Sequence, residues 1–263
     1  MKVIDELASA WRYLDVAHSA RVPIWNERRV VGEARAARKL PPPEPAEQDF
    51  DILVVHGFLD DGRNTRRLIS RLCAAGHRVH SADIGRNVDC GEKMLQRLID
   101  ELQLAAERAG GPVVLIGHSR GGSLSRAAAV RYPDLVAGVI TLGSPLAEPN
   151  NVTLMLKLIK LGMRELSALG VRGLMGECAD GECCGRYRAD LTGPFPSEVP
   201  LVSIYSPTDG MVGATAPQDP SADLIEVDAT HAGLTFAPAA LAAIDEALAS
   251  LKRPRHLHAV ADA

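Results

Sequence analysis

The feature of this sequence that most constrains its fold is the alternation of short apolar segments with longer helical ones. Six segments have the length and the β-branched content of strands; they are residues 51–55, 79–84, 113–116, 139–142, 202–205 and 224–227. Segments with helical periodicity lie between or after them, at residues 65–75, 92–109, 119–131 and 238–251. Such a pattern predicts an α/β protein with a mainly parallel, doubly wound sheet and helices on both faces.

Two composition shifts predict the domain boundaries. The run Pro41-Pro42-Pro43-Glu44-Pro45 is typical of a stiff connector, so we expect an N-terminal helical arm with this connector over residues 1–48. The main domain should cover residues 49–252, followed by a polar tail at 253–263. The segment 147–196 is far longer than the roughly 12 residues that a simple crossover needs. This length predicts an inserted cap. Residues 154–163 are apolar beyond the needs of one helix face, so we expect a cap helix lying over apolar surface.

Charge and composition exclude several classes of protein. The formal net charge is 29 − 33 = −4, which provides no basic field for a nucleic acid. Asp5 and Glu6 interrupt the stretch where a secretory signal would be apolar, and no long uncharged apolar run follows. We therefore expect a cytoplasmic protein with no integral membrane segment. Its oligomeric state is open.

The strongest candidate for chemistry is the pentapeptide Gly117-His118-Ser119-Arg120-Gly121. It follows a predicted strand and precedes a predicted helix, which is the setting of a serine nucleophile on a sharp turn. Small residues two positions before and after the serine let neighbouring backbone pass, and the helix directs its amino-terminal N–H groups at the reacting oxygen. These observations predict Ser119 as a nucleophile, against the alternative of a glycine-rich turn with a capping serine.

A serine hydroxyl needs a base, and the base needs a carboxylate to orient it. His231 follows the last predicted strand, and Asp209 lies in the loop after the strand at 202–205. The resulting chain order, Ser, Asp, His, is the one expected for this kind of turn. Asp209 could instead initiate a turn, in which case Asp223 or Asp228 would orient the imidazole.

The negative charge that collects on the carbonyl oxygen during attack needs fixed donors. The backbone N–H of Arg120, directly after the nucleophile, is one candidate, and that of Phe58, after the first strand, is the second. Gly57 would allow the close backbone approach that the second donor requires. The Phe58 ring and His118 are the candidate substrate-binding residues.

Residues from about 51 to 250 resemble the α/β-hydrolase superfamily, of the bacterial lipase and esterase type. The stretches that carry the resemblance are His56-Gly57-Phe58-Leu59, Gly85-Arg86-Asn87, residues 113–122, Thr141-Leu142-Gly143-Ser144-Pro145, residues 205–210 and Thr230-His231. The resemblance implies hydrolysis of a small-molecule or lipid ester through an acyl-enzyme, with no metal or organic cofactor and with the insertion acting as a lid. The apolar residues of that insertion favour a hydrophobic acyl group. The alternatives are an acyltransferase or thioesterase with the same triad, and a catalytically idle binding module.

The five cysteines are too few and too unevenly spaced for a disulfide framework. Cys73 and Cys90 are isolated in the sequence, whereas Cys178, Cys183 and Cys184 cluster. This cluster lacks the paired Cys-x2-Cys spacing of a closed zinc site, so we predict no metal. Two states of this cluster remain as alternatives. Cys178 forms a disulfide with Cys183 or Cys184, or all three cysteines are free thiols.

Overall fold

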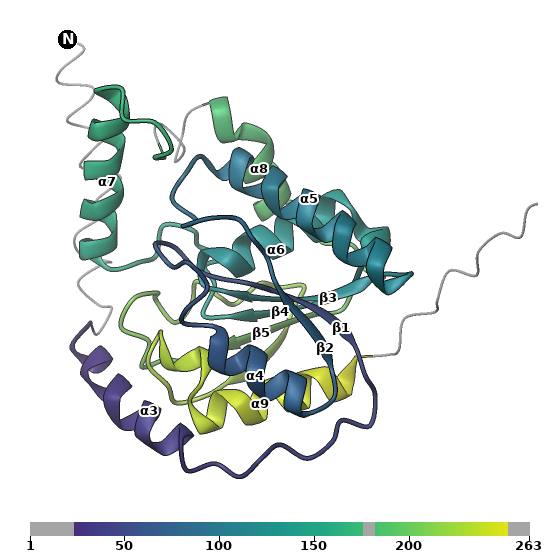
Figure 1. The fold of residues 1–263 in the computed structure, drawn as a ribbon. Helices are drawn as coiled ribbons and strands as arrows, with labels where there is room; N and C mark the ends of the chain where they lie inside the picture. The colour runs from purple at the N-terminus through teal and green to yellow at the C-terminus, as the bar shows by residue number, and fades with distance from the viewer. Residues whose placement is uncertain (1–23, 176–181, 252–263) are drawn as a thin grey trace, which may run out of the picture.

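The computed structural model describes residues 24–175 and 182–251. Its centre is one sheet of six strands in the order β2-β1-β3-β4-β5-β6, in which all five pairings are parallel (Figure 1). The strands are β1 (Asp51–Val55), β2 (Arg78–Ser81), β3 (Val113–His118), β4 (Val136–Leu142), β5 (Leu201–Tyr205) and β6 (Asp223–Glu226). The predicted α/β fold class with a parallel sheet is thus confirmed.

Burial differs between the middle and the edges of the sheet. Every residue of β3 is buried, because helices cover both faces of a parallel sheet and leave no strand position for solvent. The edge strands β2 and β6 are mostly exposed. This contrast explains why the central strands are near-continuous apolar runs, whereas β2 and β6 carry charged residues.

Helices form one layer on each face of the sheet (Figure 1). On one face, α4 (Arg66–Ala74) and α9 (Pro238–Ser250) pack against Ile52, Val54 and neighbouring strand residues. On the other, α5 (Gly91–Ala109) and α6 (Arg120–Arg131) pack against Leu53 and Val55. Successive residues of β1 therefore point to opposite layers, as the two-residue repeat of a strand requires.

The described part of the N-terminal arm comprises η1 (Ile24–Arg29) and α3 (Val30–Ala37). Helix α3 contacts α9 and η4 (Gly233–Thr235). Residues 1–23, which include the start of the predicted arm, lie outside the described residues, as do residue 252 and the predicted tail at 253–263.

The insertion between β4 and β5 contains α7 (Leu154–Ala168), η3 (Glu182–Cys184) and α8 (Gly185–Thr192). Helix α8 packs on α5 and α6, whereas α7 lies outside the two helix layers (Figure 1).

The cap helix covers apolar surface in part, because Leu156 packs against the buried side chains of Val152, Val212 and Ala216. The one buried residue of α7 is Lys157, and large apolar side chains, Met155, Leu158 and Leu166, are exposed. Apolar residues lie all around this helix, so its sequence does not determine which side faces the protein. The long aliphatic stem of a lysine can be buried along an inward face.

The other short helix in the described residues is η2 (Pro133–Leu135), which leads into β4. Within the described ranges, no helix combines the length and the apolar character that a membrane crossing would need.

Candidate active site

Ser119 lies on the sharp turn between β3 and α6, with φ 54° and ψ −125°. A positive φ is strained for a residue with a side chain and persists only where the surroundings impose it. Here the Ser119 N–H donates to the Leu142 carbonyl at 2.9 Å, which ties the turn to the end of β4. The structure thus places Ser119 at the carboxyl ends of the central strands.

The glycines around Ser119 are required by close backbone contacts. A Cβ at Gly121 would collide with the carbonyl oxygen of Val55, and one at Gly117 would collide with Cα of Gly122. The predicted need for small residues on both sides of the serine is confirmed.

Asp209 and His231 form a hydrogen-bonded pair. Asp209 Oδ2 lies 2.7 Å from His231 Nδ1, and the other carboxylate oxygen accepts the backbone N–H groups of Met211 at 2.7 Å and Val212 at 2.9 Å. Asp209 is only 3% exposed, so these donors replace the water that its charge would otherwise require. The pair is held in one orientation by the loop after β5.

The two other candidate carboxylates lie elsewhere. Asp228 is exposed and bonds to Thr208 and Arg29; these hydrogen bonds, Thr208 first, lower its pKa. Asp223 is exposed at the start of the edge strand β6. Of the three carboxylates considered from the sequence, Asp209 is the one in contact with His231.

The electrostatic surroundings of His231 favour its protonated form. Burial lowers the pKa of the ring, but the charge of Asp209, the hydrogen bond that the ring donates to Asp209 and the charge of Glu27 together raise the pKa above its ordinary value. Such a ring holds a proton more strongly than an exposed histidine does, which suits a group that accepts and then returns a proton.

Gly143 lies beside the Asp209–His231 pair. It has φ +57°, and a Cβ there would lie 3.0 Å from Asp209 Oδ2 and 3.3 Å from His231 Nδ1. Gly143 directly follows Leu142, whose carbonyl binds the Ser119 amide. The Ser119 amide and the Asp209–His231 pair thus adjoin consecutive residues, Leu142 and Gly143, at the end of β4.

His118 lies beneath the His231 loop. Its Nε2 is 2.9 Å from the His231 carbonyl oxygen, and the centroids of the two rings are 4.8 Å apart. Burial, the neighbouring His231 and His56 lower the pKa of His118 to about 3, so the ring is neutral. These contacts are those of a residue that supports His231.

Phe58 and Arg120 flank Ser119 from two elements. A Cβ at Gly57 would lie 3.1 Å from Ser119 Cβ, so the backbone leading to Phe58 approaches the turn as closely as predicted. Arg120 is the first residue of α6, and its guanidinium donates to the carbonyls of Asn87 at 2.7 Å and Asp89 at 2.8 Å. The Arg120 side chain is therefore occupied in holding the loop after β2.

The structure adds two acidic residues that the sequence analysis did not single out. Glu27 Oε1 accepts the backbone N–H groups of His231 at 2.8 Å and Gly210 at 2.9 Å. Glu33 accepts the N–H of Thr230 at 2.9 Å and its hydroxyl at 2.5 Å. The N-terminal arm thus braces both loops of the Asp–His pair, and no local motif indicates this role.

The cysteines depart from the predicted arrangement. Cys90 is not isolated, because its Sγ lies 3.3 Å from Cys184 Sγ. No disulfide joins any two of the four cysteines that the structure describes, which are Cys73, Cys90, Cys183 and Cys184. Cys178 lies outside the described residues, so a disulfide that includes it stays a prediction.

Comparison with known proteins agrees with this architecture. The family described as alpha/beta hydrolase fold matches residues 52–166. The mature form of a Bacillus licheniformis lipase superposes with a TM-score of 0.58 at 16% identity, covering 80% of this chain and 96% of that one. The protein has the α/β-hydrolase fold.

Two further similarities concern hydrolases. A metagenomic carboxyl esterase superposes on this α/β-hydrolase-fold protein with a TM-score of 0.56 at 14% identity, covering 80% of this chain and 78% of the esterase. A pyrethroid hydrolase of Sphingobium wenxiniae is 34% identical over 104 residues, which span 38% of this chain and 37% of that enzyme. The sequence similarity to this relative thus covers well under half of either protein.

Proposed function

We propose that this protein is a serine hydrolase that cleaves carboxylic esters through an acyl-enzyme. The observation that carries the proposal is the buried Asp209–His231 hydrogen bond at 2.7 Å, together with Ser119 in a strained turn at the same edge of the sheet. A buried carboxylate that orients an imidazole beside such a serine has the arrangement that acyl transfer needs.

In the proposed reaction, Ser119 Oγ attacks the ester carbonyl carbon while His231 Nε2 accepts the hydroxyl proton. Asp209 fixes the tautomer with the proton on Nδ1 and stabilises the imidazolium cation. The backbone N–H groups of Phe58 and Arg120 bind the oxyanion. His231 then returns the proton to the leaving alkoxide, which departs as the alcohol.

Water completes the cycle. His231 removes a proton from a water molecule, the resulting hydroxide attacks the acyl-enzyme carbonyl, and Ser119 leaves with the proton that His231 returns. The products are the carboxylic acid and the alcohol, and the enzyme is regenerated. An alcohol, amine or thiol in place of water would make the protein an acyltransferase, and a thioester substrate would make it a thioesterase.

The comparisons support this proposal at the level of chemistry. Lipase and carboxyl esterase structures share the fold, and a pyrethroid hydrolase shares part of the sequence. The proposed substrate is a small-molecule or lipid ester. Its acyl preference has to be measured, because α7 exposes large apolar side chains that were expected to lie against a substrate.

The test combines an active-serine probe with turnover. Wild-type protein should react with a fluorophosphonate and should hydrolyse p-nitrophenyl esters without an added acceptor, and a series of acyl chains would define its preference. Ser119→Ala should abolish both activities. Ser125→Ala is the matched control, because this serine lies on the same helix with its hydroxyl bonded to the Gly121 carbonyl.

Three results would redirect the proposal. Labelling that survives Ser119→Ala would remove Ser119 from the nucleophile role. Turnover only with an added alcohol, amine or thiol would indicate a transferase. A folded wild-type protein that neither reacts with the probe nor hydrolyses any ester would indicate a binding module.

A further inference from the structure

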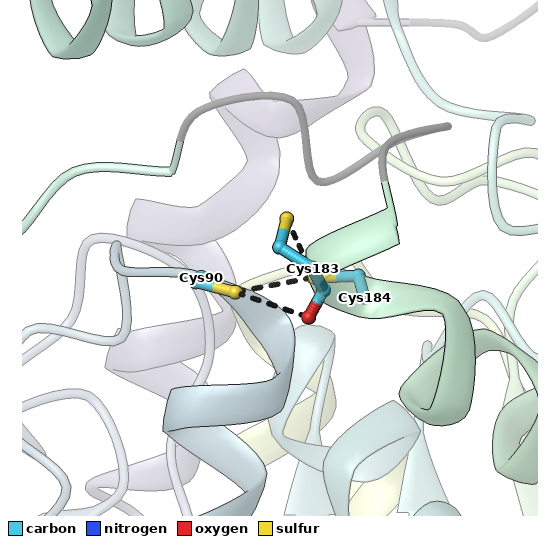
Figure 2. Close-up of side chains that lie close together, drawn as sticks. All are labelled: Cys90, Cys183 and Cys184. Carbon is cyan, nitrogen blue, oxygen red and sulfur yellow. Dashed lines mark hydrogen bonds between the residues drawn. The ribbon is translucent and has the colours of Figure 1, made fainter.

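Three cysteines from distant parts of the chain meet beside α5 and α8. Cys90 immediately precedes α5, and Cys184 immediately precedes α8, with Cys183 adjacent to it (Figure 2). The Sγ atoms of Cys90 and Cys184 are 3.3 Å apart, those of Cys183 and Cys184 are 3.9 Å apart, and all three lie within 4.8 Å of one another. None of these three cysteines takes part in the mechanism proposed above.

The spacing of these sulfur atoms fits a shared metal ion. Zinc binds thiolate sulfur at about 2.3 Å with tetrahedral angles, which places two ligand sulfurs about 3.8 Å apart. A disulfide would need about 2.05 Å. The distance of 3.9 Å matches the metal-ligand value, and the distance of 3.3 Å is shorter than that value but far longer than a disulfide.

Packing between α5 and α8 holds the sulfurs together. A Cβ at Gly91 would lie 2.7 Å from the Tyr187 ring and 3.4 Å from Cys184 Sγ. Glycine at this position is therefore needed for the two helix starts to come so close. Cys184 is fully buried, whereas Cys183 is exposed, so the cluster has a closed inner side and an open outer side.

The two helix ends beside the cluster favour the thiolate form of the cysteines. Two helix amino termini favour negative charge on the residues that precede them. With no cation, three neighbouring thiolates would repel one another. A cation bound by all three sulfurs would remove this repulsion.

We propose that Cys90, Cys183 and Cys184 bind a Zn²⁺ ion as thiolates. On binding, three S–H groups release their protons to solvent, three Zn–S bonds form, and the hydrated ion loses the water molecules that the sulfurs replace. Three thiolates leave one further tetrahedral position, which a water molecule or another ligand would fill. Thiolate-rich sites of this kind select zinc over hard cations.

The zinc ion would fasten the insertion to the body of the protein. It joins the start of α8, which belongs to the insertion, to the start of α5. The loop just before Cys90 includes Asn87 and Asp89, whose carbonyls hold the Arg120 guanidinium. The proposed role of the metal is structural. The loop that it would hold contacts Arg120, the residue that follows the proposed catalytic serine.

The test measures zinc directly on the full-length protein. Protein kept reduced, incubated with Zn²⁺ and desalted should hold zinc equimolar with the chain by mass spectrometry of the metal. Cys90→Ser should weaken zinc binding roughly 100-fold, taking the binding free energy of a structural zinc as shared among its ligands. Cys73→Ser, which changes an exposed cysteine on α4, should leave zinc binding unchanged.

Two further readouts guard against a variant that simply misfolds. Co²⁺ in place of Zn²⁺ should give the visible absorption of a tetrahedral thiolate site in the wild type and in Cys73→Ser, and a weakened spectrum in Cys90→Ser. Chelation should lower the melting temperature of the wild type by more than that of Cys90→Ser. Ser119→Ala should bind zinc as the wild type does, so failure of the proposed hydrolysis and failure of this site are distinguishable.

The proposal is overturned if the reduced wild-type protein holds no zinc, or if Cys90→Ser binds zinc and Co²⁺ as tightly as the wild type. It is also overturned if thiol counting on freshly purified protein finds Cys90 and Cys184 joined in a disulfide that persists in the presence of Zn²⁺ and a thiol reductant.

Discussion

Replacing Glu27 should uncouple the N-terminal arm from the proposed active site. One oxygen of this carboxylate accepts the N–H groups of both Gly210 and His231, and the Glu27 chain packs so tightly that a Cβ at Gly210 would lie 2.7 Å from its Cγ. Glu27→Ala therefore removes two charge-assisted hydrogen bonds from the two loops that carry the Asp–His pair.

The expected loss of stability follows from these bonds. A hydrogen bond to a charged group contributes about 1.5–3 kcal/mol, so two such bonds set an upper range of about 3–6 kcal/mol. Glu27 is only half-buried, and water can satisfy part of what is lost. We therefore expect Glu27→Ala to reduce the free energy of unfolding by about 2–3 kcal/mol, as measured by urea denaturation.

Glu27→Gln separates the charge from the hydrogen bonds. The amide oxygen can still accept both N–H groups, so the stability loss should be below about 1 kcal/mol. The charge of Glu27 raises the pKa of His231, and removing it should lower that pKa. Because the neutral ring is the base, the acidic limb of the kcat/KM profile should move to lower pH.

The control is Glu107→Gln, which changes an exposed glutamate on α5 and should alter neither the stability nor the pH profile. The reasoning is refuted if Glu27→Ala unfolds at the wild-type urea concentration. It is also refuted if the acidic limb for Glu27→Gln stays in place or moves to higher pH.

Three further predictions test the site and the core. The wild-type kcat/KM should rise with pH through a pKa above the ordinary histidine value, since Asp209 and Glu27 more than offset the effect of burial on His231; a profile flat through neutral pH contradicts this. Gly143→Ala should cost at least about 1–2 kcal/mol of unfolding free energy, because its φ is +57°. It should also lower kcat, because the new methyl group meets Leu234 first and then the Asp209–His231 pair; unchanged kcat in a folded variant contradicts this. Arg126→Met should cost about 3–5 kcal/mol by urea unfolding, because it leaves the buried Asp219 without its partner at 2.6 Å; a cost below about 1 kcal/mol would show that this ion pair is dispensable.

Much of the sheet could be predicted because local patterns reflect local geometry. The first strand has the predicted bounds, residues 51–55. The second was predicted to run to residue 84 but ends at Ser81, since Ala82 and Ile84 are buried in the loop that follows rather than in the strand. Burial and strand pairing give the same apolar signal, so the sequence pattern does not separate them.

The turn at Ser119 could also be predicted. Glycines two positions before and after the serine indicate that neighbouring backbone packs against the turn with no room for a Cβ atom. The sequence limited the carboxylate that orients His231 to three candidates, Asp209, Asp223 and Asp228. It did not select one of them, since all three lie near the ends of the last two strands. Only the packing of the loop after β5 brings one of them to 2.7 Å from the ring.

The sequence by itself determined the parallel α/β architecture and the position of the strained serine, because both depend on residue periodicity and backbone freedom over short stretches. Tertiary structure alone decided that Glu27 braces the His231 loop, that α7 turns Lys157 inward, and that Cys90 meets Cys184. These contacts join residues up to 204 positions apart. A local sequence pattern does not show which distant residues come into contact when the helices pack on the sheet.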